Sequence, residues 1–205
     1  MINFINFTIQ NTKTMKKTTI SLVLTFAAFA LSANLKAQLL TDNHTVTISV
    51  PEVALVDIEP SATKNITLGF TAPTEAGNAI TPSTANTTLW LNYSSIKSVA
   101  DPTRSVSVSV NEIIPGIDIQ VTAAPATGSG GGAVGTAAAQ LTLKATPQNI
   151  ISGIGSAYTG NGANNGHNLT YALVAGSTPG GVAAYADLQA VATKVATVTY
   201  TISDN

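Results

Sequence analysis

The stretch Ser105–Val110 has the sequence SVSVSV, in which serine and valine alternate without a break. Successive side chains of a β-strand point to opposite faces of a sheet, so this spacing predicts a strand with one apolar and one hydroxyl-bearing face. Ile117–Val121 (IDIQV) repeats the pattern, and Val195–Ile202 places three threonines opposite an apolar row. That row consists of Ala196, Val198, Tyr200 and Ile202. Strands of this kind are typical of antiparallel sheets that cover a core with one face.

Further segments are expected to be strands because they are enriched in Val, Ile and Thr. They are Thr45–Val50, Val53–Ile58, Ile66–Phe70, Thr88–Tyr93, Gln140–Ala145 and Leu169–Ala175. Pro115-Gly116 lies between two alternating runs and predicts a tight turn, with glycine at the positive-φ position. Pro51 predicts that the first strand bends or lies at a sheet edge.

Many short strands without helical periodicity predict an all-β fold, and we expect an Ig-like antiparallel β-sandwich. Residues 38–205 suffice for one such domain. Within it, residues 123–139 include the run GSGGG at 128–132 and are interpreted as a long flexible loop. Ala183–Thr193 is expected to form at most one or two helical turns.

The start of the chain has the parts of a secretory signal peptide. Lys16 and Lys17 precede an apolar run over residues 20–33, and small residues follow it. The run is shorter than the roughly twenty residues that a membrane-spanning helix needs. We therefore expect cleavage between Ala37 and Gln38, with residues 1–14 as an over-extended start. The mature chain would have no membrane span and would reach the periplasm, the outer surface or the medium.

The charge balance and the absence of cysteine exclude several functions. After cleavage five basic residues remain against ten acidic ones, a formal charge of −5. No basic patch remains to displace counterions from nucleic acid, so nucleic acid is not expected as a partner. With no cysteine, neither disulfides nor a lipid-modified cysteine can form. The fold must rest on core burial alone.

Few side chains are suited to catalysis or metal binding. Asp57 and Glu59 share one face of a predicted strand, where they serve either as a solvated surface or as an acid/base pair for a glycan-active enzyme. His44 and His167 are the only histidines and lack metal-ligand spacing. We therefore expect no catalytic residues, no metal and no cofactor.

Two other patterns have alternative interpretations. Gly130–Gly135 (GGGAVG) matches the dinucleotide fingerprint formally, but that motif works between a strand and a helix, and none is predicted here. Trp90, Tyr93 and Tyr158 are candidates for stacking on a sugar, with core packing as the alternative. Trp90 and Tyr93 fall on opposite faces of a regular strand and would not share one surface.

The first alternating segment of the mature chain, Thr45–Val50, suggests an assembly mechanism. A strand can leave its own subunit and add to the sheet of another, with alternate side chains filling pockets. Val46, Ile48 and Val50 would be those side chains. The alternative is an ordinary first strand of a closed sandwich.

A lysine-led signal ending in Lys-Ala-Gln, short Thr/Ser/Val strands and the terminal run ATVTYTI (residues 196–202) resemble exported fimbrial, pilin-like or spore-coat-U-like subunits of Gram-negative bacteria. The resemblance implies an Ig-like sandwich and assembly at the surface. Leu89–Leu91 (LWL) is also similar to the Trp-x-Leu motif of cell-wall-binding surface domains.

These observations predict a non-enzymatic, exported structural or adhesive subunit of the bacterial cell surface. Its partners would be other surface subunits or further copies of itself. The alternative function is a secreted carbohydrate-binding module, whose partner would be a glycan.

Overall fold

The computed structural model describes residues 41–176 and 184–205, which contain antiparallel strands and two 3-10 turns but no α-helix. All the strands lie in the second of two compact units, Val50–Asn205, and the first unit ends at Ser49. The elements are β1 (Val53–Glu59), η2 (Ser61–Thr63), β2 (Phe70–Thr71), β3 (Thr81–Pro82), β4 (Asn86–Ile96), β5 (Arg104–Val110), β6 (Ile117–Ala123), β7 (Gly131–Ala137), β8 (Leu141–Thr142), β9 (Gln148–Tyr158), β10 (His167–Ala175), η3 (Tyr185–Asp187) and β11 (Val198–Asp204).

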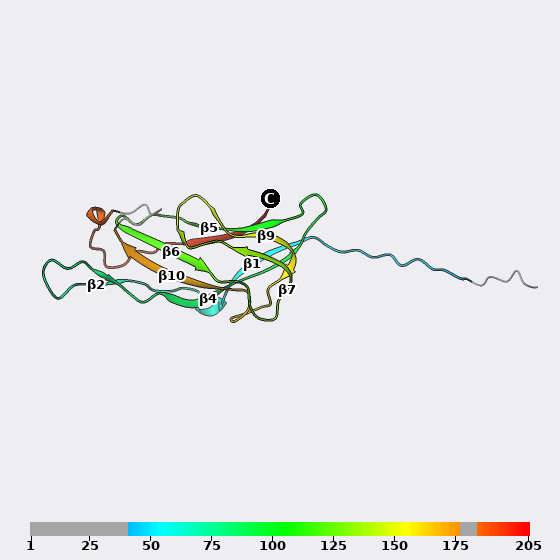
Figure 1. Ribbon diagram of the computed structural model, residues 1–205, viewed down its shortest axis with the longest axis horizontal. Coiled ribbons are helices and arrows are strands. Elements are labelled where there is room, and N and C mark those ends of the chain that lie inside the picture. The colour runs from blue at the N-terminus through cyan, green and yellow to red at the C-terminus, as the bar shows by residue number, and fades with distance from the viewer. Residues whose placement is uncertain (1–40, 177–183) are drawn as a thin grey trace, which may run out of the picture. The chain divides into compact units, whose positions relative to one another are not determined.

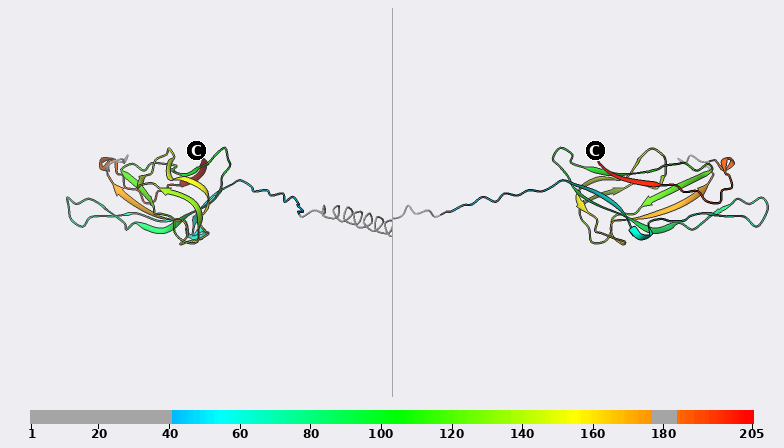
Figure 2. Two further views of the ribbon diagram at one scale, coloured as in Figure 1. Left: turned by 45° about the vertical axis from the view of Figure 1, so that its right-hand side comes forward. Right: turned by 180° about the vertical axis from the view of Figure 1, so that it is seen from behind.

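Nine strands form one continuous sheet in the order β11-β5-β9-β4-β10-β6-β8, with β1 added to β4 and β7 added to β9. β9 pairs with β5 along most of its length and with β4 only at Ala157 and Tyr158. The sheet folds over at this junction, so that β4 and β10 lie on one side of the core and β5 and β9 on the other (Figure 1). The two layers are seen from other sides in Figure 2. The antiparallel pairing and the two layers are consistent with the predicted β-sandwich.

The hydrophobic core lies between the two layers. Val106, Val108 and Val110 are at most 2% exposed, which places the valines of SVSVSV inside as predicted. The opposite layer contributes Leu89, Leu91, Val121 and Leu169. Tyr171 of β10 and Tyr200 of β11 join the layers through hydroxyls 2.6 Å apart, and burial raises the pKa of Tyr171 to about 12.

The strongly alternating segments were predicted well. Residues 105–110, 117–121 and 53–58 lie in β5, β6 and β1. Of the strand expected at 195–202, only residues 198–202 lie in β11, and residues 195–197 belong to no strand. The Pro115-Gly116 turn is also confirmed, because Ile117 N donates to Ile114 O at 3.1 Å and Gly116 has a φ of 78°. Residues 88–93 and 169–175 belong to the longer strands β4 and β10. Residues 66–70 and 140–145 contribute only to the two-residue strands β2 and β8.

The expected flexible loop at 123–139 is wrong, because β7 occupies its second half. β7 pairs with β9, and its glycines allow a close approach between the two strands. A Cβ on Gly132 would stand 2.3 Å from Ser156 O, and one on Gly130 would stand 2.6 Å from Tyr158 O. The glycine run therefore reflects backbone packing rather than mobility.

β9 itself was not predicted from the sequence. Its register with β5 shifts twice, so that Ile150, Ile151 and Ile154 are all buried although they do not alternate. An extra residue in one strand of a pair disrupts the period of two on which the prediction depends. Near residues 183–193, where one or two helical turns were expected, the structure has the 3-10 turn η3. Ala183 lies outside the described residues.

Candidate functional site

The segment before β1 is exposed and belongs to no strand. Residues 41–52 have no regular secondary structure, and Val46, Ile48 and Val50 are 70%, 78% and 70% exposed. The interpretation of Thr45–Val50 as an ordinary first strand of the sandwich is therefore wrong. Pro51 offers a physical reason, because it has no N–H with which to continue a ladder into β1. The expected cleavage site, Ala37 and Gln38, lies outside the described residues.

Arg104, at the start of β5, is only 1% exposed. Its side chain is the centre of a cluster of ion pairs and hydrogen bonds within the described residues. Its guanidinium forms ion pairs with Glu52 and with Asp204, the latter at 2.6 Å from Nε to Oδ1. It also donates to three further oxygens: Val53 O at 2.7 Å, Ile96 O at 3.0 Å and Ser95 Oγ at 3.2 Å. A buried charge is tolerated only when it is paired and hydrogen-bonded in this way.

The Arg104 contacts join three strands that meet at one end of the sandwich. They hold the start of β1, the end of β4 and the end of β11 against β5. Glu52 immediately follows Pro51, so this cluster fixes the point at which the exposed segment ends and β1 begins. Sequence reasoning missed it. The one available signal was that Arg104 is the only arginine in the sequence and directly precedes SVSVSV.

The three candidate aromatic residues do not form one platform. Tyr93 points into the core and is 3% exposed, Trp90 is half-buried on the other face of β4, and Tyr158 is 57% exposed at the end of β9. The Tyr93 ring stacks on that of His167, with centroids 5.6 Å apart. Tyr93 is therefore a core residue.

His167 is buried and belongs to an internal hydrogen-bond network. Its Nδ1 lies 2.7 Å from Ala124 O, and its Nε2 lies 2.8 Å from the Tyr93 hydroxyl, which also contacts Val134 O. Nδ1–H donates to the Ala124 carbonyl, and the Tyr93 hydroxyl, which has a single proton, donates it either to Val134 O or to Nε2. Burial lowers the pKa of His167 below its usual 6.5, with the contact to Ala124 O opposing the shift.

The lowered pKa of His167 predicts that stability falls in mild acid. Below pH 6.5 the unfolded chain takes up a proton that the folded chain resists, so the stabilisation present above pH 6.5 is lost progressively until the folded pKa is reached. We expect up to about 1.4 kcal/mol of lost unfolding free energy per pH unit. Urea unfolding of the mature chain and of His167→Gln between pH 7.5 and 4.5 measures this. If the unfolding free energies of the two proteins depend on pH in the same way, the prediction is contradicted.

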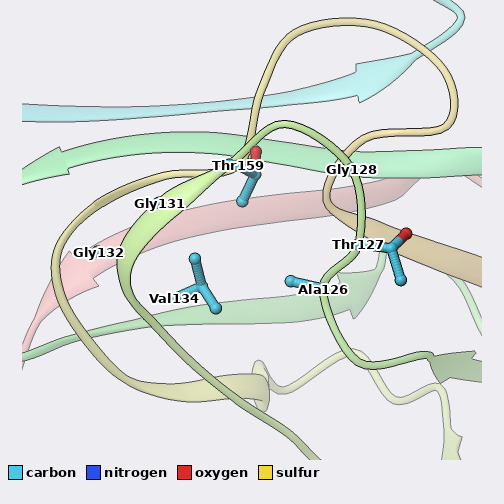
Figure 3. A pocket seen from close by; sticks show the side chains of 8 residues that line it. Ala126, Thr127, Gly128, Gly131, Gly132, Val134 and Thr159 are labelled. Atoms are coloured by element: carbon cyan, nitrogen blue, oxygen red, sulfur yellow. The ribbon is translucent and has the colours of Figure 1, made fainter.

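The glycine motif borders a small pocket. The pocket has a volume of about 150 Å³ and is lined largely by backbone and small side chains (Figure 3). The lining residues are Ala126, Thr127, Gly128, Gly130, Gly131, Gly132, Val134 and Thr159. None of them carries a charge, and the motif forms the edge strand β7 rather than a turn into a helix. The pocket therefore lacks the helix N-terminus that holds a dinucleotide phosphate.

The other polar candidates in the described residues form no metal-binding group. His44 lies in the segment before β1, far along the chain from buried His167. Asp57 and Glu59 are on β1, where each carboxylate accepts a backbone hydrogen bond, from Ile58 N and Ser61 N respectively. Among residues 41–176 and 184–205, no group of three or more His, Asp or Glu is arranged to hold a metal ion.

A scan against protein-family models, a search of curated proteins and a search of solved structures each found no match to this chain. Within the same described ranges, no helix has the length and apolarity needed to cross a membrane.

Proposed function

We propose that this protein is an exported structural subunit of a bacterial surface, with an Ig-like sandwich that assembles through strand exchange between copies. Export would follow from cleavage of residues 1–37. The observation that carries the proposal is the exposed alternating segment Thr45–Val50. Three of its side chains are β-branched and apolar, and all three are at least 70% exposed.

This segment is suited to pair with a sheet edge. Val46, Ile48 and Val50 are spaced two residues apart, so in an extended strand they lie on one face, with Thr45, Thr47 and Ser49 on the other. Burying the three apolar side chains on a partner would contribute roughly 3–6 kcal/mol. Main-chain hydrogen bonds would add about 0.5–1.5 kcal/mol each, against the cost of ordering the segment.

The acceptor we propose is the edge of a second copy where β1 and β11 approach each other. β11 ends the sheet order and β1 pairs only with β4, so each has one edge without a strand among the described residues. The two strands contact each other across the layers.

Both strands at this edge carry hydrophobic side chains that pack on the core but remain partly exposed. They are Val56 and Ile58 of β1 and Val198, Tyr200 and Ile202 of β11. By contrast, Val106, Val108 and Val121 in the inner strands are fully covered. An added strand carrying three apolar side chains would complete the coverage.

The experiment that tests this function is the assembly state of the mature chain, residues 38–205, with and without its first thirteen residues. Sedimentation velocity and negative-stain electron microscopy should reveal ladders or fibres of the mature chain. A strictly monomeric mature chain over a wide concentration range would count against the proposal.

A further inference from the structure

The outward face of the layer that contains β1, β4 and β10 carries a group of polar side chains around Trp90. Leu89 and Leu91, its neighbours in β4, are 3% and 0% exposed in the core, so the indole lies on the opposite face. It is half-buried there. Trp90 is the only tryptophan of the sequence.

The strand register places polar side chains on both sides of the indole. Glu59 of β1 is directly opposite Trp90, and Asn168 of β10 is opposite it on the other side. Directly paired residues in antiparallel strands have Cβ atoms about 4.5–5.5 Å apart. Asp57 lies two residues from Glu59 on the same face and pairs with Asn92. The structure thus places the Asp57–Glu59 pair beside Trp90, whereas the sequence suggested the pair and the tryptophan separately.

Backbone contacts fix several of these side chains. Glu59 Oε2 accepts from Ser61 N at 2.7 Å. Asn168 Nδ2 donates to Thr87 O and Leu89 O at 2.9 and 3.2 Å, which leaves its Oδ1 as an acceptor for a ligand. Polar groups fixed in this way lose little entropy when a ligand binds.

Asn92, on the same face, provides an independent indication of a ligand. It is 5% exposed, and its Nδ2 donates to Asn165 O at 2.6 Å, but its buried Oδ1 has no hydrogen-bond partner among the described residues. An unpaired buried acceptor is costly, by about 1–3 kcal/mol. A water molecule that enters beside this atom when the ligand binds would supply the missing donor.

We propose that this face binds a neutral oligosaccharide through Trp90, Glu59, Asp57 and Asn168. The C–H face of a sugar ring packs on the indole, and its hydroxyls donate to the carboxylates and to the amide oxygen, as charge-assisted bonds where the acceptor is ionised. Two carboxylates, in a mature chain whose formal charge would be −5 after loss of residues 1–37, disfavour an acidic glycan. None of the residues of this site lies in Thr45–Val50, and Asp57 and Glu59 belong to the face of β1 rather than to the main-chain edge that would accept an exchanged strand.

The fluorescence of the single tryptophan reports on this site directly. We would titrate the mature chain with amylose, xylan, galactomannan and mixed-linkage β-glucan, follow indole emission, and measure retardation in gels that contain each polysaccharide. Polygalacturonate and polylysine serve as acidic and basic probes. The variants are Trp90→Ala, the double variant Asp57→Asn with Glu59→Gln, and Tyr158→Ala, an exposed aromatic outside the site as matched control.

The expected result is an emission change and retardation with at least one neutral polysaccharide. Affinity should fall at least tenfold in the carboxylate variant and in Trp90→Ala, and stay within twofold in Tyr158→Ala. If Trp90→Ala does not fold, the carboxylate variant decides alone. No response to any neutral polysaccharide, an equal response in all variants, or a response only to polygalacturonate or polylysine would overturn the proposal.

Discussion

Deletion of residues 38–50 is expected to convert an assembling protein into a monomer while leaving its fold intact. The segment contributes no strand to the sandwich, and Val46, Ile48 and Val50 are largely exposed. Glu52, which pairs with Arg104, remains in the shortened chain. We expect ladders and fibres to disappear in sedimentation velocity and microscopy. The unfolding free energy should change by less than about 0.5 kcal/mol, as for surface changes generally.

A pair of matched triple variants separates the apolar face of this segment from its length. Replacing Val46, Ile48 and Val50 with asparagine removes the side chains proposed to fill the partner and should abolish assembly. Replacing Thr45, Thr47 and Ser49 with asparagine alters the other face and should leave assembly intact. Assembly that survives the first triple variant, or fails equally in both, would show that the alternating apolar face is not what pairs.

Neutralising both acidic partners of Arg104 is expected to cause the largest loss of stability from any surface-accessible change. The double variant Glu52→Gln with Asp204→Asn leaves a guanidinium that is 1% exposed without a counter-charge, although each carboxylate is itself nearly half exposed. Breaking a buried ion pair from one side costs about 3–5 kcal/mol. Urea unfolding of the mature chain measures the loss.

The exposed pair Lys194–Glu112 provides the control for the Arg104 experiment. Its side chains are 40% and 47% exposed, and Nζ lies 2.6 Å from Oε1. Glu112→Gln should therefore cost less than about 1 kcal/mol. If the double variant at Arg104 costs no more than this control, the cluster does not hold the ends of β1, β4 and β11 together.

The strands that could be predicted from the sequence are those in which apolar and polar residues alternate with a period of two. Valines at 106, 108 and 110 alternate because one face of β5 meets a continuous core, so their spacing alone was informative. β7 and β9 could not be found in this way. In β9 the register shifts bury successive isoleucines, and in β7 glycine is required by the closeness of the partner backbone.

The candidate sites show the same limit. The alternation predicted that Val46, Ile48 and Val50 share one face of a strand. Whether that face would be buried depended on Pro51 and on strand pairing, which only the structure specifies. Asp57 and Glu59 were considered apart from Trp90, since their proximity to the indole depends on the register between β1 and β4. Arg104 forms its contacts with residues that are distant in sequence, such as Glu52 and Asp204, so no local pattern marked it.

Hydrogen exchange of the backbone amides of residues 45–50 tests strand exchange most directly. In the monomer these residues form no strand, so their amides should exchange at rates close to those of an unstructured peptide. In the assembled protein, alternate amides of this segment should become protected to the level of β5, together with amides at the open edges of β1 and β11. Assemblies in which residues 45–50 exchange as fast as in the monomer would contradict the account.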